Sequence, residues 1–241
     1  MHIPMPKQVE VIPAASRGHR NFGWLQAHYS FSFGEYFDPQ RLHFGALHVL
    51  NDDTIAPGTG FGMHPHRNME IITIPLEGHL LHRDSMGHQA VISAGQVQVM
   101  SAGTGIFHSE YNASNEHPLK LLQIWIVPQH LQVAPRYDMT SLPHLKDQWI
   151  TIVGPQHNGG LLWIHQQAWL SLATLNAGTS LTYSLHQPDY GMYLFLIDGK
   201  TDVLQFSLNP RDALKCKQTT ELSVLAKEPS RLLLIEVPLM E

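Results

Sequence analysis

The sequence has little cysteine and little charge, and each shortage narrows the class of protein. Cys216 is the one cysteine in 241 residues, which excludes an intrachain disulfide and favours a reducing compartment. Charged residues make up 15% of the chain, and 20 acidic residues outnumber 15 basic ones. Nucleic acids and anionic membrane surfaces favour clustered Lys and Arg, so we expect neither as a direct partner.

Long apolar runs are also missing. The longest stretches, such as Leu121–Val127, are far shorter than the roughly 20 residues that a membrane-spanning helix needs. The first six residues, MHIPMP, have no charged region followed by an apolar run and a small-residue cleavage site, so no signal peptide is expected. Together with the single cysteine, these features predict a cytoplasmic protein.

Short runs of β-branched, aromatic and aliphatic residues, broken by Gly, Pro, Asn and Asp, are abundant, whereas helical periodicity is almost absent. The pattern predicts strands at 46–50, 70–76, 96–100, 120–127, 149–153, 161–165, 169–175, 180–185, 192–197, 203–208 and 231–237. It predicts turns at 51–53, 77–78, 158–160 and 198–199. Many strands at this spacing are typical of antiparallel sandwiches or barrels, so the expected fold class is all-β.

A faint internal repeat divides the chain. Residues 69–78 resemble 191–199, and 119–128 resemble 230–238, in the same order in both halves. The repeat predicts two β domains, 1–130 and 131–241, which meet near a proline-containing stretch.

Two pairs of potential metal ligands are the most informative motifs: His64-Pro65-His66 and His108-Ser109-Glu110. Side chains two residues apart on a strand point to the same face, so each pair can direct two ligands inward. The 44 residues between His64 and His108 leave room for several strands that return the second pair beside the first. Three imidazoles and one carboxylate suit a first-row transition metal and leave coordination positions open, which indicates chemistry.

Histidines are concentrated in the first half, which holds thirteen of the seventeen. Aligning Gly199 with Gly78 puts Leu185 and Gln187 opposite the first histidine pair, so the second half is predicted to carry no metal site.

The other histidines and the aromatic residues are given structural or surface roles. His79, His82 and His88 flank a polar hairpin and are expected to be solvated. Four aromatic residues are expected in the core: Trp24, Phe31, Phe33 and Phe107.

The two motifs resemble those of a known family. The pattern Gly58-x5-His64-x-His66-x3-Glu70-x7-Gly78 is nearly the first cupin motif, and AGTGIFHSEYN at 102–112 resembles the second. Ser101, where many cupins have proline, and the longer turn before the histidine depart from the general pattern and match the pirin family. Segments at 23–25, 31–39 and 123–128 also resemble pirins. The likeness is good over about residues 18–130 and loose beyond.

Pirins are bicupins, so the resemblance implies two cupin barrels, the first with metal and the second without. It implies His64, His66, His108 and Glu110 as the metal ligands. In most cupins the glutamate of the first motif, here Glu70, binds the metal in place of Glu110. The spacing does not exclude this, because Glu70 would face the same side as His64 and His66 on an unbroken strand. With Glu110 as ligand, Glu70 is expected to orient a ligating imidazole.

The resemblance also implies a reaction, that of quercetin 2,3-dioxygenase. A flavonol or related aromatic enol would be cleaved with O2, with Glu110 as general base. Iron is the expected metal, with Cu, Ni, Zn and Mn as alternatives, because imidazole suits several of these ions. Two other interpretations stay open: a metal-dependent, redox-responsive regulatory module with a protein partner, and a different cupin enzyme such as an isomerase. The spacings themselves support only an open metal site.

Overall fold

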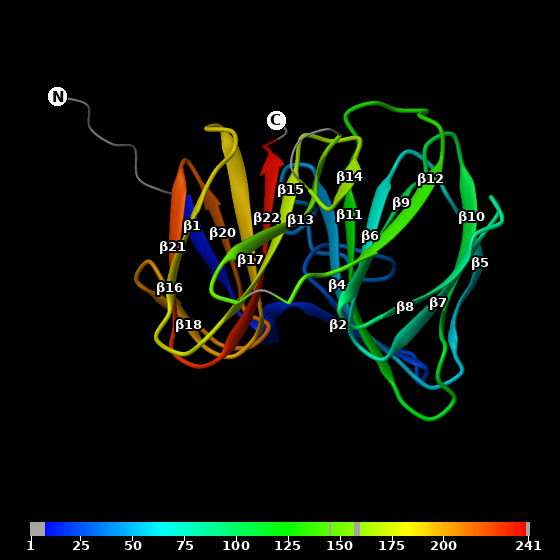
Figure 1. Ribbon diagram of the computed structural model, residues 1–241, viewed down its shortest axis with the longest axis horizontal. Helices are drawn as coiled ribbons and strands as arrows, with labels where there is room; N and C mark the ends of the chain where they lie inside the picture. The colour runs from blue at the N-terminus through cyan, green and yellow to red at the C-terminus, as the bar shows by residue number, and fades with distance from the viewer. Residues whose placement is uncertain (1–7, 145, 157–159, 240–241) are drawn as a thin grey trace.

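The computed structural model describes residues 8–144, 146–156 and 160–239, and nearly all of its regular structure is strand. Within these ranges the only helical element is a short 3-10 turn at Ala14–Ser16. Two barrels lie side by side, each made of a seven-stranded and a four-stranded sheet, with the four-stranded sheets at the outer ends (Figure 1). The all-β prediction is confirmed.

The first barrel contains the metal-ligand motifs. Its large sheet has the order β12-β9-β6-β11-β4-β3-β2, and its small sheet has the order β5-β10-β7-β8. The large sheet consists of β2 (Gly18–Asn21), β3 (Leu25–Tyr29), β4 (Leu47–Ile55), β6 (Glu70–Glu77), β9 (Gln96–Ser101), β11 (Leu119–Ile126) and β12 (Arg136–Ser141). The small sheet consists of β5 (Gly60–His66), β7 (His79–Asp84), β8 (Gln89–Ser93) and β10 (Ile106–Asn112).

The second barrel repeats this plan. Its sheets have the orders β1-β20-β17-β22-β15-β13-β14 and β16-β21-β18-β19. The large sheet consists of β1 (Gln8–Ile12), β13 (Trp149–Pro155), β14 (Leu162–Ile164), β15 (Trp169–Leu175), β17 (Tyr190–Asp198), β20 (Ala213–Lys217) and β22 (Ser230–Pro238). The small sheet consists of β16 (Ser180–Ser184), β18 (Thr201–Val203), β19 (Phe206–Leu208) and β21 (Glu221–Ala226).

The internal repeat is confirmed by these orders. The repeated segments form β6 and β11 in one sheet and β17 and β22 in the other, and the two strands of each pair are hydrogen-bonded neighbours. The equivalence extends outward, because β9 and β20 flank these pairs on one side and β4 and β15 on the other.

Two edge strands lie on the opposite side of the expected division at residue 130. Strand β1, from the start of the chain, pairs with β20 of the second barrel, and β12 pairs with β9 of the first. They occupy equivalent edges of the two large sheets, so the barrels exchange their edge strands. An edge strand is held mainly by backbone hydrogen bonds, and its side chains give little sign of which sheet it joins.

The turn expected at 51–53 is wrong, because β4 continues to Ile55. Strands β3 and β11 pair with it on both sides through this stretch, and the backbone ladder outweighs the turn preference of Asn and Asp. The turns at 77–78 and 198–199 are confirmed, with Gly78 and Gly199 at φ 84° and 85°. The expected strand at 203–208 is instead the hairpin of β18 and β19. The turn expected at 158–160 falls largely outside the described residues.

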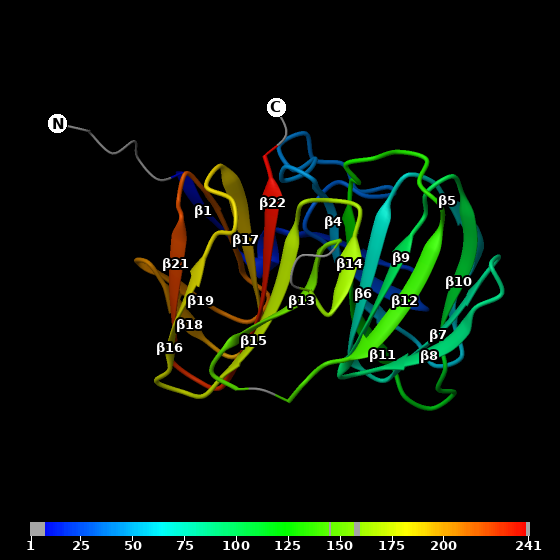
Figure 2. The same cartoon turned by 45° about the horizontal axis from the view of Figure 1, so that its top comes forward.

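The two large sheets lie next to one another in the middle of the molecule (Figure 2). Their facing side chains form one shared core. Leu50 and Ile124 of the first barrel belong to the same buried cluster as Phe195 and Leu233 of the second. Burial of this shared apolar surface fixes the barrels against one another.

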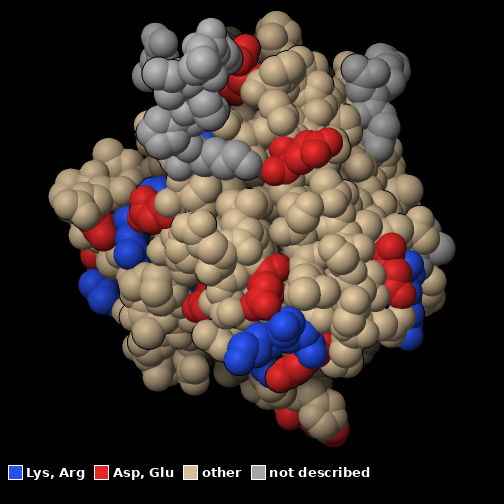
Figure 3. Space-filling view, turned by 90° about the vertical axis from the view of Figure 1, so that its left-hand side faces the viewer, with Lys and Arg blue, Asp and Glu red and all other residues tan. Residues whose placement is uncertain are grey.

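No helix in the described part of the chain is long and apolar enough to cross a membrane. On the outer face of the second barrel, Lys and Arg form small separate groups rather than a continuous basic surface (Figure 3).

Candidate metal centre

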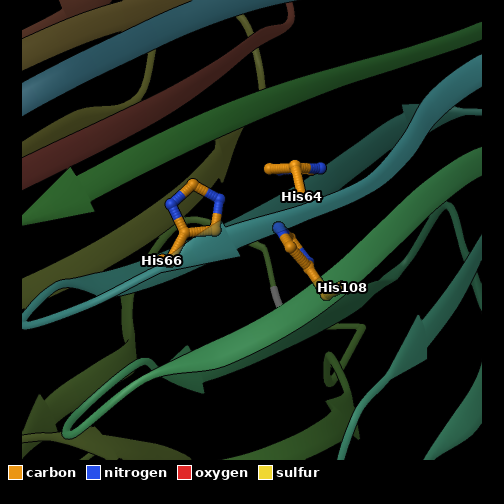
Figure 4. A group of neighbouring side chains, drawn as sticks. All are labelled: His64, His66 and His108. Carbon is orange, nitrogen blue, oxygen red and sulfur yellow. The ribbon is translucent and has the colours of Figure 1, made fainter.

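The structure brings three of the predicted ligands together on the inner face of the small sheet in the first barrel. Strands β5 and β10 are antiparallel neighbours, and His108 lies directly opposite His64 in their register. The ring centroids of His64, His66 and His108 are 4.4–4.9 Å apart, and one ligand nitrogen from each lies within 4.8 Å of the others (Figure 4).

Glu110 lies on the same strand and in the same pocket but on another side of the cluster. The register shifts between His108 and Glu110, where β5 contributes an extra residue, and Glu110 pairs with Phe61. Its carboxylate falls in a second group of potential ligands, with His82 and His108, again within 4.8 Å. His108 is therefore common to both groups.

Three side chains from the opposite sheet hold the buried carboxylate of Glu110. Thr73 Oγ1 and Gln98 Nε2 donate to Oε1 at 3.2 and 2.9 Å, and Gln123 Nε2 donates to Oε2 at 2.6 Å. Hydrogen bonds to an ionised acceptor are stronger than neutral ones, so this set fixes the carboxylate in the barrel interior. These three residues were not predicted from the sequence. The one feature of the sequence that could have indicated them is that each is a polar residue at an inward-facing position of an otherwise apolar strand.

Two of the three imidazoles, those of His66 and His108, are in the protonation state that a metal requires. Burial, with the neighbouring histidines, lowers the pKa of His66 to about 4 and that of His108 to about 3, so both rings are neutral at pH 7. Both ring nitrogens of His108 are buried without a hydrogen-bond partner, so one of them is free to bind a cation. His64 Nδ1 lies 2.7 Å from the Gly62 carbonyl, which favours the tautomer with Nε2 free to bind metal. The donor set fits a first-row transition metal.

His82 contradicts the expectation that it is solvated. It is completely buried, its ring stacks on Tyr137 at 4.4 Å, and its Nε2 lies 3.2 Å from Asp84 Oδ2. The same oxygen lies 2.9 Å from Nδ1 of His88, which is exposed, as is His79. Inward alternation of His82 and Asp84 along β7 was the signal that could have found this pair.

The expected role of Glu70 is also wrong. Glu70 begins β6, in a different sheet from β5, and Asn68 at φ 51° intervenes, so strand parity with His64 and His66 does not apply. Ser101 Oγ donates to its carboxylate at 2.6 Å. The imidazole that it contacts is His165, at 3.1 Å, rather than a histidine of the cluster.

A cavity of about 420 Å³ opens beside the imidazoles and has mainly apolar walls. Its aromatic lining consists of Phe22, Trp24, Tyr29, Phe33, Phe61 and Trp125, and its polar lining includes Asn51, Asp53, Glu110 and Gln123. Size and lining suit a flat aromatic molecule. A second cavity, about 300 Å³ at the seam of the barrels, contains none of the clustered histidines.

The predicted core aromatics divide into three groups. Phe31 is buried, as expected. Trp24 and Phe33 are partly buried and form walls of the cavity. Phe107 is 52% exposed, because alternation along β10 turns it away from His108 and out of the barrel.

The equivalent strands of the second barrel lack these ligands. By sheet order β16 and β21 correspond to β5 and β10, and their sequences, SLTYS and ELSVLA, contain no histidine. His186, which follows β16, stacks on Trp169 at 4.4 Å, and its Nδ1 lies 2.8 Å from Glu236 Oε2.

Family models match both halves of the chain: Pirin over residues 11–126 and the quercetinase C-terminal cupin domain over 151–237. The chain belongs to the pirin family. It is 42% identical to a putative quercetin 2,3-dioxygenase of Zymomonas mobilis, over 92% of this chain and 95% of that protein. It is 38% identical to a quercetin 2,3-dioxygenase of Escherichia coli, over 93% and 96%.

Solved structures agree. YhhW from Escherichia coli superposes with a TM-score of 0.93 at 35% identity, covering 97% of this chain and 99% of that one. The same bacterial pirin in complex with nickel(II) gives 0.91, covering 97% and 100%. The bicupin fold and the pirin resemblance are thus confirmed, and the nickel-bound relative together with the histidine cluster implies a divalent metal.

Proposed function

We propose that this pirin is a metal-dependent dioxygenase that cleaves a flavonol, or a related aromatic enol, with O2. The observation that carries the proposal is the cluster of three imidazoles, with His66 and His108 neutral at pH 7, beside an aromatic cavity of about 420 Å³. Relatives named quercetin 2,3-dioxygenase support the same chemistry.

In this proposal His64, His66 and His108 hold the metal, and Glu110 is the fourth ligand. A divalent transition metal there would acidify a coordinated hydroxyl and supply the electron chemistry that dioxygen requires. Iron is our choice for the native metal, and the nickel(II) bound by YhhW is the first alternative. Ligand type leaves Cu, Zn and Mn to be tested with them.

The protein's own residues bind the substrate and accept its proton. Trp125, whose ring meets that of His66 edge-on at 4.8 Å, and Phe61 form walls against which a flat ring can lie while water is excluded. Glu110, held by Thr73, Gln98 and Gln123, takes the proton of the enol hydroxyl as general base. Removal of that proton makes the ring electron-rich and ready to react with O2.

The test begins with elemental analysis of the purified protein. The metal is then removed with a chelator and replaced by Fe, Ni, Cu, Zn or Mn in separate samples, and oxygen uptake is measured with a panel of flavonols. We expect uptake with at least one metal, and its loss in His64→Ala and His108→Ala. The exposed His117 supplies a matched control, because His117→Ala should keep full uptake. Metal-loaded protein that consumes no oxygen with any flavonol would overturn the proposal.

A further inference from the structure

Two polar side chains in the lining of the cavity have oxygens without hydrogen-bond partners. Asn51 and Asp53 lie two apart on β4 and face inward, and each is 2% exposed. Oδ1 of Asn51 and Oδ1 of Asp53 are both buried and unpartnered, and both residues line the cavity that contains His64 and Glu110. Buried polar atoms are nearly always paired in folded proteins, so two unpaired oxygens facing one cavity point to a ligand.

The neighbouring side chains do not satisfy these oxygens. Gln123 lies opposite Asn51, but its Nε2 donates to Glu110 and its Oε1 accepts from Trp125 Nε1 at 3.3 Å. Leu121 and Ala27, which flank Asp53 in the sheet, are apolar.

Cations lie on the other face of β4. Arg17 and Arg211 both reach Asp52, the adjacent residue, at 3.5 and 3.2 Å. Burial, together with the charges of Asp52 and Glu110, raises the pKa of Asp53 well above its usual range. A carboxyl group that keeps its proton can both donate a hydrogen bond and accept one.

We propose that Asp53, assisted by Asn51, determines specificity by hydrogen-bonding a second hydroxyl of the aromatic ligand, besides the enol hydroxyl bound at the imidazoles. The pocket then binds polyhydroxylated aromatic compounds more tightly than aromatic compounds that carry the enol hydroxyl alone. This inference rests on the proposed function for the class of ligand. It does not depend on turnover.

The role of Asp53 is tested by measuring how wild type and Asp53 variants bind two ligands that differ in their hydroxyl groups. Binding of quercetin and of 3-hydroxyflavone, which keeps the enol hydroxyl and lacks the others, is measured under nitrogen on nickel-loaded protein. We expect Asp53→Leu to weaken quercetin binding by about tenfold to a hundredfold, the effect of one or two lost hydrogen bonds. Binding of 3-hydroxyflavone should change by less than about threefold. Asp53→Asn, which keeps an acceptor, should retain most of the discrimination, and Thr54→Val on the outer face of β4 is the matched control.

Thermal unfolding of the same variants separates recognition from a structural role. Because Asp53 Oδ1 has no partner to lose, Asp53→Leu should unfold at the wild-type temperature or above it. Equal weakening of both ligands, undiminished quercetin binding, destabilisation by both Asp53 variants, or no binding of either compound to wild type would each overturn the inference. Oxygen uptake by wild-type protein loaded in turn with Fe, Ni, Cu, Zn and Mn tests the dioxygenase separately. If the protein distinguishes the two compounds but takes up no oxygen with any of these metals, the proposed function is refuted and the role of Asp53 in recognition is supported.

Discussion

His165 places its Nδ1 3.1 Å from Oε1 of Glu70, and so joins the second barrel to the first at a fully buried carboxylate. Burial raises the pKa of Glu70, against the hydrogen bonds from Ser101 and His165 that lower it. The first-motif glutamate, a metal ligand in most cupins, is here part of the contact between the two halves.

Glu70→Gln should therefore affect stability and spare the metal. We expect the free energy of unfolding to fall by about 1–3 kcal/mol, because the paired carboxylate and its charge-assisted hydrogen bonds are lost. Metal content per chain should be unchanged. Urea unfolding and elemental analysis of the same sample check both points, and a protein that loses its metal while keeping its stability would return Glu70 to the ligand set.

The donors around Glu110 should matter for activity. Gln98→Leu removes the 2.9 Å hydrogen bond to Oε1, and we expect metal affinity or kcat to fall by about tenfold to a hundredfold, the usual effect of losing a group that orients a ligand. Gln26→Leu, on an exposed position of β3, is the control. Metal titration and oxygen uptake measure the change. Wild-type values in Gln98→Leu would show that the carboxylate needs no such support.

Glu110→Gln should abolish proton transfer by Glu110 while leaving the three histidine ligands in place. If Glu110 accepts the enol proton, kcat falls by about a hundredfold or more, while the three histidines retain bound metal. Steady-state kinetics with quercetin and metal analysis of the variant provide the comparison. Unchanged kcat would leave Glu110 without a role in proton transfer.

The metal-free protein should lose stability on acidification. The pKa of His108 is about 3 in the folded chain and about 6.5 in the unfolded one. Between these values the unfolded state binds a proton that the folded state does not, so this contribution is complete above about pH 6.5 and declines as the pH falls toward 3. The loss reaches about 1.4 kcal/mol per pH unit for this residue.

Urea unfolding of chelator-treated protein between pH 4 and 7 measures that slope. The slope should be shallower in His108→Leu, because the variant has no imidazole at this position to protonate. Identical slopes in the two proteins would mean that His108 binds its proton at the same pH in the folded and unfolded states.

Much of the fold was predictable because its strands are apolar and bounded by strong turn residues. The strand expected at 169–175 agrees with β15, and Gly78 and Gly199 end the equivalent strands β6 and β17. The exchanged edge strands β1 and β12 were missed, since their partners are chosen by backbone pairing and by the path of the chain. The turn predicted at 51–53 was wrong for a related reason. Backbone hydrogen bonds to the strands on both sides of β4 outweigh the turn preference of Asn and Asp.

The histidine cluster was predictable from spacing, because alternation on two adjacent strands is sufficient to bring His64, His66 and His108 together. Its surroundings were not. The burial of His82 depends on the stack with Tyr137, whose strand comes from beyond residue 130. The contact of Glu70 with His165 joins residues 95 positions apart, a distance at which local patterns carry no information.

The most direct test of the central claim is the fate of oxygen atoms during turnover of quercetin by the metal-loaded protein under 18O2. A dioxygenase forms two new carbon–oxygen bonds from one O2 as the ring opens and carbon monoxide leaves. We expect a ring-opened product that carries two 18O atoms, and one carbon monoxide per quercetin, with neither formed by His108→Ala or under nitrogen. Quercetin loss without incorporated 18O, or at the same rate in His108→Ala, would contradict it.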